Sequence, residues 1–105
     1  MIHHFILWRY TDAAESYGKE VLIAELNRRF QALIGQIQGM LSVHIRPCDV
    51  KGVPGYHDLM LYAEFTDKEA LARYMDDGRH KAIRDWDQQY VCDRAGFDYE
   101  CNPKS

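Results

Sequence analysis

The chain has 105 residues, of which 47% are hydrophobic and 28% are charged, and its formal net charge is −3 at pH 7. A chain of this length is typical of one domain, and we expect a single domain over residues 1–101 with a short C-terminal tail, residues 102–105. Positive and negative residues are mixed along the chain and form no basic patch, so we expect no nucleic-acid partner. No apolar stretch approaches the roughly 20 residues that cross a membrane, so we expect no membrane partner.

The cysteines indicate a reducing compartment. Cys48, Cys92 and Cys101 cannot all pair within one chain, and none belongs to a C-x-x-C motif. The first ten residues, MIHHFILWRY, lack the basic leader and the small-residue cleavage site of a signal peptide. We therefore expect free thiols and a cytoplasmic location.

The first predicted element is a strand over residues 2–10 (IHHFILWRY), which is almost wholly apolar apart from His3, His4 and Arg9. Apolar residues on both sides of a strand are typical of a strand that is covered on both faces. The segment that follows breaks this pattern, and its Asp12 can cap a helix.

From about residue 14 to residue 37 the spacing of apolar residues becomes helical. Steps of three and four residues separate Leu22, Leu26, Phe30, Leu33 and Ile37. This spacing predicts one amphipathic helix with a single apolar face. Gly39 follows the last of these residues and is the expected terminator.

The rest of the chain returns to strand patterns and then to a second helical region. Residues 41–46 (LSVHIR) alternate in polarity, which predicts a strand. The later elements are a loop at 47–56, a strand at 57–65, a helix from Thr66 or Asp67 to near Gly78, a helical stretch at 79–90 and a strand at 95–101.

This order of elements, β-α-β-β-α-β, predicts the ferredoxin-like α+β fold with a four-stranded antiparallel sheet. Its helices cover one face of the sheet and leave the other bare. The strands at 2–10 and 57–65 are apolar on both sides, so the second face also needs a cover. A second copy of the same sheet is the simplest cover, which predicts a two-fold homodimer.

Five segments follow one another in the order and at the spacings of a known family. They are MIHHFILWRY, IGQIQGMLSV, GYHDLMLYAEFTDKEALARY, DDGRHKAIRD and FDYE. Together they resemble the stress-responsive A/B barrel domain (Dabb) family over about residues 1–100. The resemblance implies a dimeric α+β barrel, and many members of this family have no assigned activity.

One relative of the same fold provides a chemical precedent. Olivetolic acid cyclase, a plant polyketide cyclase, closes a ring by an aldol-type reaction without a cofactor, using a tyrosine and a histidine. The resemblance places its tyrosine on Tyr74 and its histidine on His80, six residues later. It also places the histidine of the cavity wall in the first strand on His4. The chain departs from the family at Asp77-Gly78-Arg79, where a turn containing proline is more common.

These residue types suit the removal of a proton next to a carbonyl group. The reference pKa of histidine, about 6.5, lies near working pH, and a phenol can donate a hydrogen bond to a developing enolate. On a straight helix Tyr74 and His80 would not share a face, but a bend at Gly78 would turn both toward one cavity. The resemblance therefore implies His80 as a base and Tyr74 as a donor acting on a small carbonyl compound.

An apolar cavity around this pair would bind the substrate. We expect its wall to contain His4, Ile6, Trp8, Leu26, Phe30, Ile83 and Trp86. The relative carries aromatic side chains at the positions of Leu26 and Phe30, so the resemblance does not fix the shape of the substrate. The same residues are also compatible with an ordinary core, in which Tyr74 packs its ring and His80 interacts with a helix end.

Other functions fit the same scaffold. One is a non-enzymatic homodimer that binds a small molecule or protects against stress. Another is a different reaction, because cofactor-free monooxygenases, mutarotases and lactone isomerases also resemble dimeric α+β barrels. No cofactor is expected, since the chain lacks a phosphate-cradling glycine loop and a dinucleotide fingerprint.

No metal site is expected either. His3 and His4 would point to opposite faces of a regular strand, and no His/Cys cluster has zinc-like spacing. Asp76 and Asp77 form an acidic pair at a helix end, which we expect to be solvated.

Overall fold

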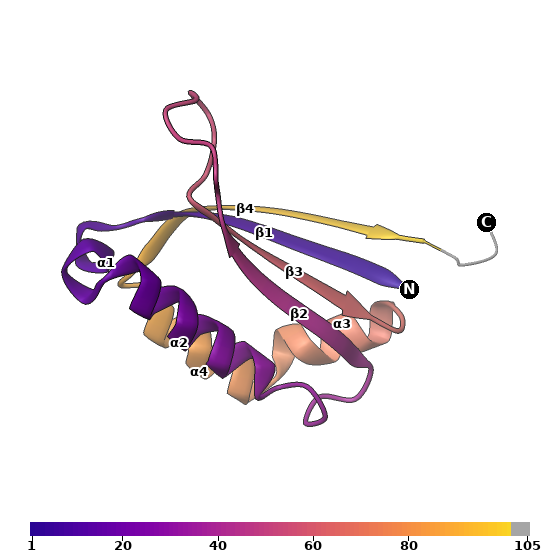
Figure 1. Ribbon diagram of the computed structural model, residues 1–105. Helices are drawn as coiled ribbons and strands as arrows, with labels where there is room; N and C mark the ends of the chain where they lie inside the picture. The colour runs from indigo at the N-terminus through magenta and orange to yellow at the C-terminus, as the bar shows by residue number, and fades with distance from the viewer. Residues whose placement is uncertain (102–105) are drawn as a thin grey trace.

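A computed structural model describes residues 1–101 of the chain, so the expected tail, residues 102–105, lies outside the described residues. Four antiparallel strands form one sheet in the order β2-β3-β1-β4, with the helices on one face (Figure 1). This confirms the predicted ferredoxin-like α+β fold. The elements are β1 (Ile2–Tyr10), α1 (Asp12–Tyr17), α2 (Lys19–Gln31), β2 (Met40–Pro47), β3 (Leu59–Phe65), α3 (Lys68–Asp76), α4 (Gly78–Asp87) and β4 (Val91–Glu100).

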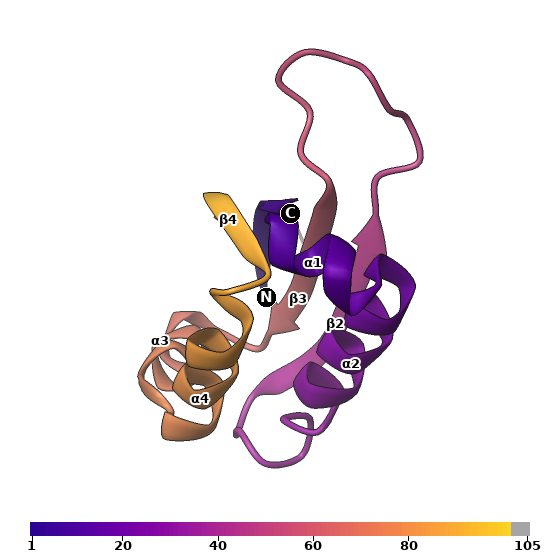
Figure 2. The same cartoon turned by 90° about the vertical axis from the view of Figure 1, so that its left-hand side faces the viewer.

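The sheet separates an inner face, which packs on the helices, from an outer face that the single chain leaves open (Figure 2). Burial alternates along β1, because Ile2, His4, Ile6 and Trp8 face the helices and are buried. The core lies between these layers and includes Leu22, Leu26, Phe30, Leu59, Leu61 and Phe65. The strand pairs place His3, Phe5, Leu7, Met60, Tyr62, Phe97 and Tyr99 on the outer face.

The prediction of one long helix over residues 14–37 is wrong, because the helix is interrupted near its start and ends earlier than expected. Gly18, with φ of +100°, separates α1 from α2, and α2 ends at Gln31. Residues 32–39 form turns whose hydrogen bonds, such as Ile37 N to Leu33 O at 3.0 Å, still hold these two apolar side chains in the core. The periodicity therefore extended beyond the helix itself.

The caps of the helices differ from expectation in two places. Thr11, not Asp12, is the N-cap of α1, and Asp12 is the first helical residue. Asp77, not Gly78, divides the second helical region, because its extended backbone (φ −70°, ψ 131°) interrupts the helix and its carboxylate accepts from Arg79 N at 2.8 Å. The expected start of α3 is confirmed, with the Asp67 carboxylate accepting from Ala70 N at 2.9 Å.

Gly39 has a different role from the predicted one, because it forms the turn into β2 instead of ending a helix. Its φ is +87°, and a Cβ at this position would lie 2.5 Å from Ala70 Cβ and 2.7 Å from Thr66 Oγ1. A side chain is therefore excluded both by backbone conformation and by the close approach of α3.

The acidic pair at the end of α3 is not merely solvated. Asp77 also forms an ion pair with Arg79 at 2.8 Å, and Asp76 forms one with Lys81 at 3.2 Å. These pairs lie at the surface beside the helix break, where such interactions contribute little to stability.

The last strand begins earlier than predicted, at Val91 instead of residue 95. Between Leu7 and Arg9 of β1 the partner residues on β4 jump from Ala95 to Cys92, which marks a bulge. Asp93 lies in this bulge with φ of +51°, and its carboxylate accepts from Arg9 Nε at 2.6 Å. Among the described residues, no helix is long and apolar enough to cross a membrane.

Candidate functional site

A cavity of about 430 Å³ opens between α4 and β4, on the inner face of the sheet. Its wall contains six of the residues predicted for the site, which are Tyr74, His80, His4, Ile6, Trp8 and Phe30. These side chains come from β1, α2, α3 and α4, so the cavity depends on the packing of both layers. The volume falls in the range of small-molecule sites.

Three predicted residues do not line this cavity. Leu26 and Ile83 are buried in the core. Trp86 packs beneath Arg29, whose guanidinium carbon lies 3.8 Å from the ring centroid, and beside Tyr17 and Tyr90. Its helix position turns it toward α2 instead of toward the cavity.

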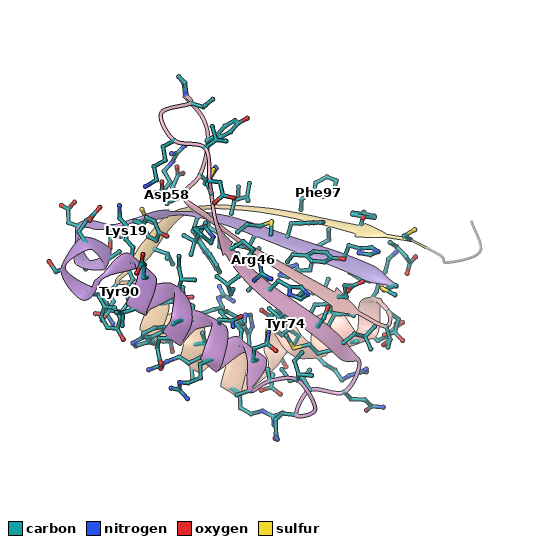
Figure 3. All side chains as sticks on the ribbon, in the orientation of Figure 1. Lys19, Arg46, Asp58, Tyr74, Tyr90 and Phe97 are labelled. Carbon is teal, nitrogen blue, oxygen red and sulfur yellow. The ribbon has the colours of Figure 1, made fainter. Side chains whose placement is uncertain are left out.

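The rings of Tyr74 and His80 stack against each other, with 3.8 Å between centroids and 25° between planes. Tyr74 lies in the last turn of α3 and His80 in the first turn of α4. A continuous helix would place these two rings on different faces, and the break at Asp77 allows the ring of His80 to stack on that of Tyr74. Figure 3 shows Tyr74 on the helix side of the sheet.

His80 is held as a neutral imidazole. It is 3% exposed, and its Nδ1 is buried with no hydrogen-bond partner among the described residues. Burial lowers the pKa of His80 to about 4, the charge of Arg84 acts in the same direction, and the backbone of Tyr74 partly opposes them. At neutral pH the ring can therefore accept a proton.

Tyr74 is held as a neutral phenol. The side chain is 1% exposed, and burial raises the pKa of Tyr74 well above its usual value. The hydroxyl keeps its proton through the physiological pH range and can donate it in a hydrogen bond.

His4, on β1, packs next to the stacked pair of Tyr74 and His80. Its Nδ1 lies 2.5 Å from Asp98 Oδ1 on β4, and its ring meets the ring of Tyr74 edge-on at 5.8 Å between centroids. The carboxylate fixes the orientation of the imidazole, as carboxylate partners of histidine generally do. His4 thus supports the position of Tyr74 from the sheet side.

The sequence analysis missed Asp87, which also lines the cavity. Asp87 is 4% exposed, and its Oδ2 has no hydrogen-bond partner within residues 1–101. Burial raises the pKa of Asp87 to about 7, although the charges of Arg84 and Arg94 act against it. The available signal was its spacing of seven residues from His80, which places both on one face of α4.

Within residues 1–101, no group of three or more His, Cys, Asp or Glu side chains has the arrangement needed to hold a metal ion. Cys48 and Cys92 are free thiols, and Cys92 lies at the cavity.

The stress responsive A/B barrel domain (Dabb) model matches residues 2–101. The chain belongs to the Dabb family. This confirms the resemblance of the five sequence segments. No match was found among the curated proteins.

Solved structures share the fold of this Dabb chain. A dimeric protein of unknown function from Bacteroides fragilis is 22% identical, with a TM-score of 0.76 and 95% of each chain covered. A protein from Arabidopsis thaliana is 19% identical, with a TM-score of 0.80, covering 100% of this chain and 99% of that one. A Dabb family protein with a ferredoxin-like fold from Mesorhizobium loti is 20% identical, with a TM-score of 0.74 and 96% of each chain covered. These TM-scores show that the proteins share one fold, although their sequences are only distantly similar.

Proposed function

We propose that this Dabb protein is a cofactor-independent enzyme that removes a proton from the carbon next to a carbonyl group of a small substrate. The observation that carries the proposal is the stacked pair of Tyr74 and His80 in the wall of one cavity. A neutral imidazole, whose Nδ1 has no hydrogen-bond partner within residues 1–101, and a neutral phenol would supply the base and the donor that such a reaction needs.

The first step transfers one proton. The free nitrogen lone pair of His80 takes the α-proton, the electrons of the C–H bond form the carbon–carbon double bond of an enolate, and the carbonyl π electrons move to oxygen. Tyr74 donates a hydrogen bond to that oxygen. The negative charge forms beside the new imidazolium, and the attraction between these opposite charges stabilises both ions.

The second step returns the proton. In an isomerase that acts on a β,γ-unsaturated carbonyl compound, the first step gives a dienolate, and the imidazolium protonates it at the γ carbon. In a cyclase, the enolate carbon attacks a second carbonyl group of the same molecule, and the resulting alkoxide takes the proton from His80. Neither route needs an oxidant or a cofactor, and the lowered pKa of His80 makes the return of the proton favourable.

The low pKa of His80 also limits the base. A base with a pKa of about 4 removes protons only from acidic carbons, such as those between two carbonyl groups. The proposal therefore favours 1,3-dicarbonyl compounds, which include β-keto esters and β-keto thioesters, over simple ketones. Ile6, Trp8 and Phe30 supply the apolar wall for the carbon chain.

We also propose that the enzyme is a homodimer that forms through the outer face of the sheet. This face carries a continuous aromatic cluster, in which Phe5 stacks on Tyr62 at 4.8 Å and His3 stacks on Tyr99 at 4.6 Å between centroids. Phe97 is 66% exposed beside them, on the side of the sheet away from the helices (Figure 3). Several proteins of similar structure are described as dimeric. A cytoplasmic location is part of the proposal, since Cys48 and Cys92 are free thiols.

One observation favours a second function. A protein of similar structure from Bacteroides thetaiotaomicron, 13% identical over 95% of this chain, with a TM-score of 0.73, is described as a possible oxidoreductase. A cofactor-free monooxygenase would use the same cavity but would consume oxygen together with an electron-rich aromatic substrate.

Exchange of α-protons with solvent deuterium tests the proposed function. The protein is incubated in D₂O with 1,3-diketones, β-keto esters and β-keto thioesters, and loss of each α-proton signal is followed by NMR. We expect exchange above the buffer rate for at least one compound. Oxygen uptake is measured in parallel, and uptake that depends on the protein would indicate the monooxygenase. Binding of a compound without proton exchange or oxygen uptake would indicate the non-enzymatic alternative.

A further inference from the structure

Two arginines on different elements line the cavity described above. Arg84 is on α4 and Arg94 is on β4, and both are exposed residues in the cavity lining. Arg94 shares its strand face with Gly96 and Asp98, whose β1 partners are the inward-facing Ile6 and His4. Both guanidinium groups are therefore available to one ligand.

Among the described residues, these two arginines differ from the others because their side chains have no hydrogen-bond acceptor. Within residues 1–101, no hydrogen bond or ion pair involves the side chain of Arg84 or Arg94. The remaining arginines each donate to a carboxylate or carbonyl oxygen, as seen for Arg9, Arg28, Arg29, Arg46, Arg73 and Arg79. Unpaired arginines that converge on one cavity are typical of a site for an anion.

The positive charges of these arginines reach the inner wall of the cavity. After burial, the charges of Arg84 and Arg94 are the main influence on the pKa of Asp87, and both also act on the pKa values of His80 and Tyr74. The anion site and the proposed acid/base pair therefore belong to one cavity. A ligand held by the arginines would lie within reach of the stacked rings.

The nearby acidic residues, Asp85 and Asp87, form no ion pair with either arginine among the described residues. The buried Oδ2 of Asp87 has no partner in the described part of the chain, and burial raises the pKa of Asp87 to about 7, so this residue carries only part of a negative charge at neutral pH. Asp85 also lines the cavity but forms no ion pair with either arginine in the described part of the chain. Lys81, the remaining cation of the lining, is already paired with Asp76.

We propose that Arg84 and Arg94 bind a carboxylate group of the substrate, which makes the substrate a small oxo acid. This inference rests on the proposed function, because the carbonyl group of that acid is what His80 and Tyr74 would act on. A guanidinium group can bind a carboxylate through two parallel hydrogen bonds, so the pair would fix both the position and the direction of the ligand. The unpartnered Asp87 Oδ2, when protonated, would donate a further hydrogen bond to it.

Matched acids and esters test this assignment by isothermal titration calorimetry. Acetoacetate, 4-oxopentanoate and 5-oxohexanoate are each compared with their methyl esters, which have the same carbon chain and no charge. We expect at least one acid to bind about tenfold or more tightly than its ester, as charged hydrogen bonds predict. This preference should shrink when NaCl rises from 20 to about 500 mM.

Substitution locates the site. Arg84→Gln and Arg94→Gln should each weaken binding of that acid about tenfold and leave binding of the ester unchanged. Arg28→Gln is the matched control, because Arg28 lies on α2 and pairs with Glu25. It removes the same charge and should change neither affinity. Thermal unfolding of each variant checks the fold, and the acid–ester comparison on the natural protein stands even where a variant unfolds.

Three results would overturn the carboxylate site: equal affinities of every acid and its ester, no binding of any acid at millimolar concentration, or tighter binding of inorganic phosphate than of any oxo acid. The last result would assign the arginines to phosphate esters instead. Acid binding that depends on both arginines, while no 1,3-dicarbonyl compound exchanges its α-protons, would support the site and contradict the proposed reaction, so the two failures are distinct.

Discussion

The imidazole of His80 lies under the phenol ring of Tyr74, 3.8 Å from centroid to centroid, although the two residues belong to different helices. The contact exists because Asp77 ends one helix and caps the next, which turns α4 back beneath the end of α3. Stacking fixes the ring planes, and both residues belong to the cavity lining. In the proposed reaction, this arrangement would hold the base, His80, and the donor, Tyr74, in a fixed position relative to each other.

Replacing Tyr74 by Phe should remove the donor and keep the ring. We expect the rate of α-proton exchange to fall about 100-fold or more, because one hydrogen bond to a developing oxyanion has about this effect. The stacked packing survives in Phe, so the free energy of unfolding should change little. Deuterium exchange and urea unfolding measure the two effects, and a variant with the natural exchange rate would exclude Tyr74 from the reaction.

Asp87 should make the protein less stable as pH rises. Its pKa is about 7 in the folded protein and about 3.9 in an unfolded chain, so the folded state binds the proton more tightly. This stabilisation is fully present below about pH 4 and is lost as pH rises through 7, by up to about 4 kcal/mol. Asp87→Asn cannot titrate, so the variant should gain stability over the natural protein between pH 5 and 8 in urea unfolding.

The exposed Asp85 on the same helix supplies the control for that measurement. Asp85→Asn should keep the pH profile of the natural protein. If Asp87→Asn also kept that profile, the carboxyl group of Asp87 would not be titrating near neutral pH.

His80 should have the opposite effect. Its pKa is about 4 in the folded protein and about 6.5 in an unfolded chain, so the unfolded state binds the proton more tightly. The contribution of His80 is present above about pH 6.5 and is lost as pH falls through 4, by about 3 kcal/mol. His80→Phe should therefore become more stable, relative to the natural protein, as pH falls from 7 to 4. A difference in unfolding free energy that is constant over this range would contradict a buried neutral imidazole.

The outer face should hold the dimer together. Phe97→Glu places a charge in the aromatic cluster, and burying an unpaired charge is costly, so we expect sedimentation to show monomers at micromolar concentration. Val21→Glu is the control, because Val21 is 58% exposed on α2, away from this face. A natural protein that sediments as a folded monomer would contradict the proposed interface.

The sequence predicted the sheet because apolar residues alternate or run continuously over each strand, and the family resemblance pointed to Tyr74 and His80. It overestimated the first helix, since Leu33 and Ile37 keep a helical spacing in turns that are not helix. It placed the start of β4 too late, because the bulge at Asp93 interrupts the strand pattern. We expected Asp76 and Asp77 to be solvated surface residues, but Asp77 interrupts the helical region and separates α3 from α4.

The cavity was harder to predict than the fold. Burial of Asp87 depends on how α4 packs against β1 and β4, and a charged residue near a helix end is usually solvated. Trp86 was expected at the cavity, but the cation–π contact with Arg29 holds it against α2. Arg84 and Arg94 line one cavity from two different elements, α4 and β4, and spacing within the chain does not reveal this.

The central claim is that His80 takes a proton from carbon. The most direct test compares α-deuteration of the best 1,3-dicarbonyl compound by the natural protein, by His80→Gln and by the control Arg28→Gln, followed by proton NMR at neutral pH. We expect the natural protein and Arg28→Gln to exchange the α-protons at the same rate and His80→Gln to fall by about 100-fold or more. Equal exchange by a folded His80→Gln variant would contradict the claim.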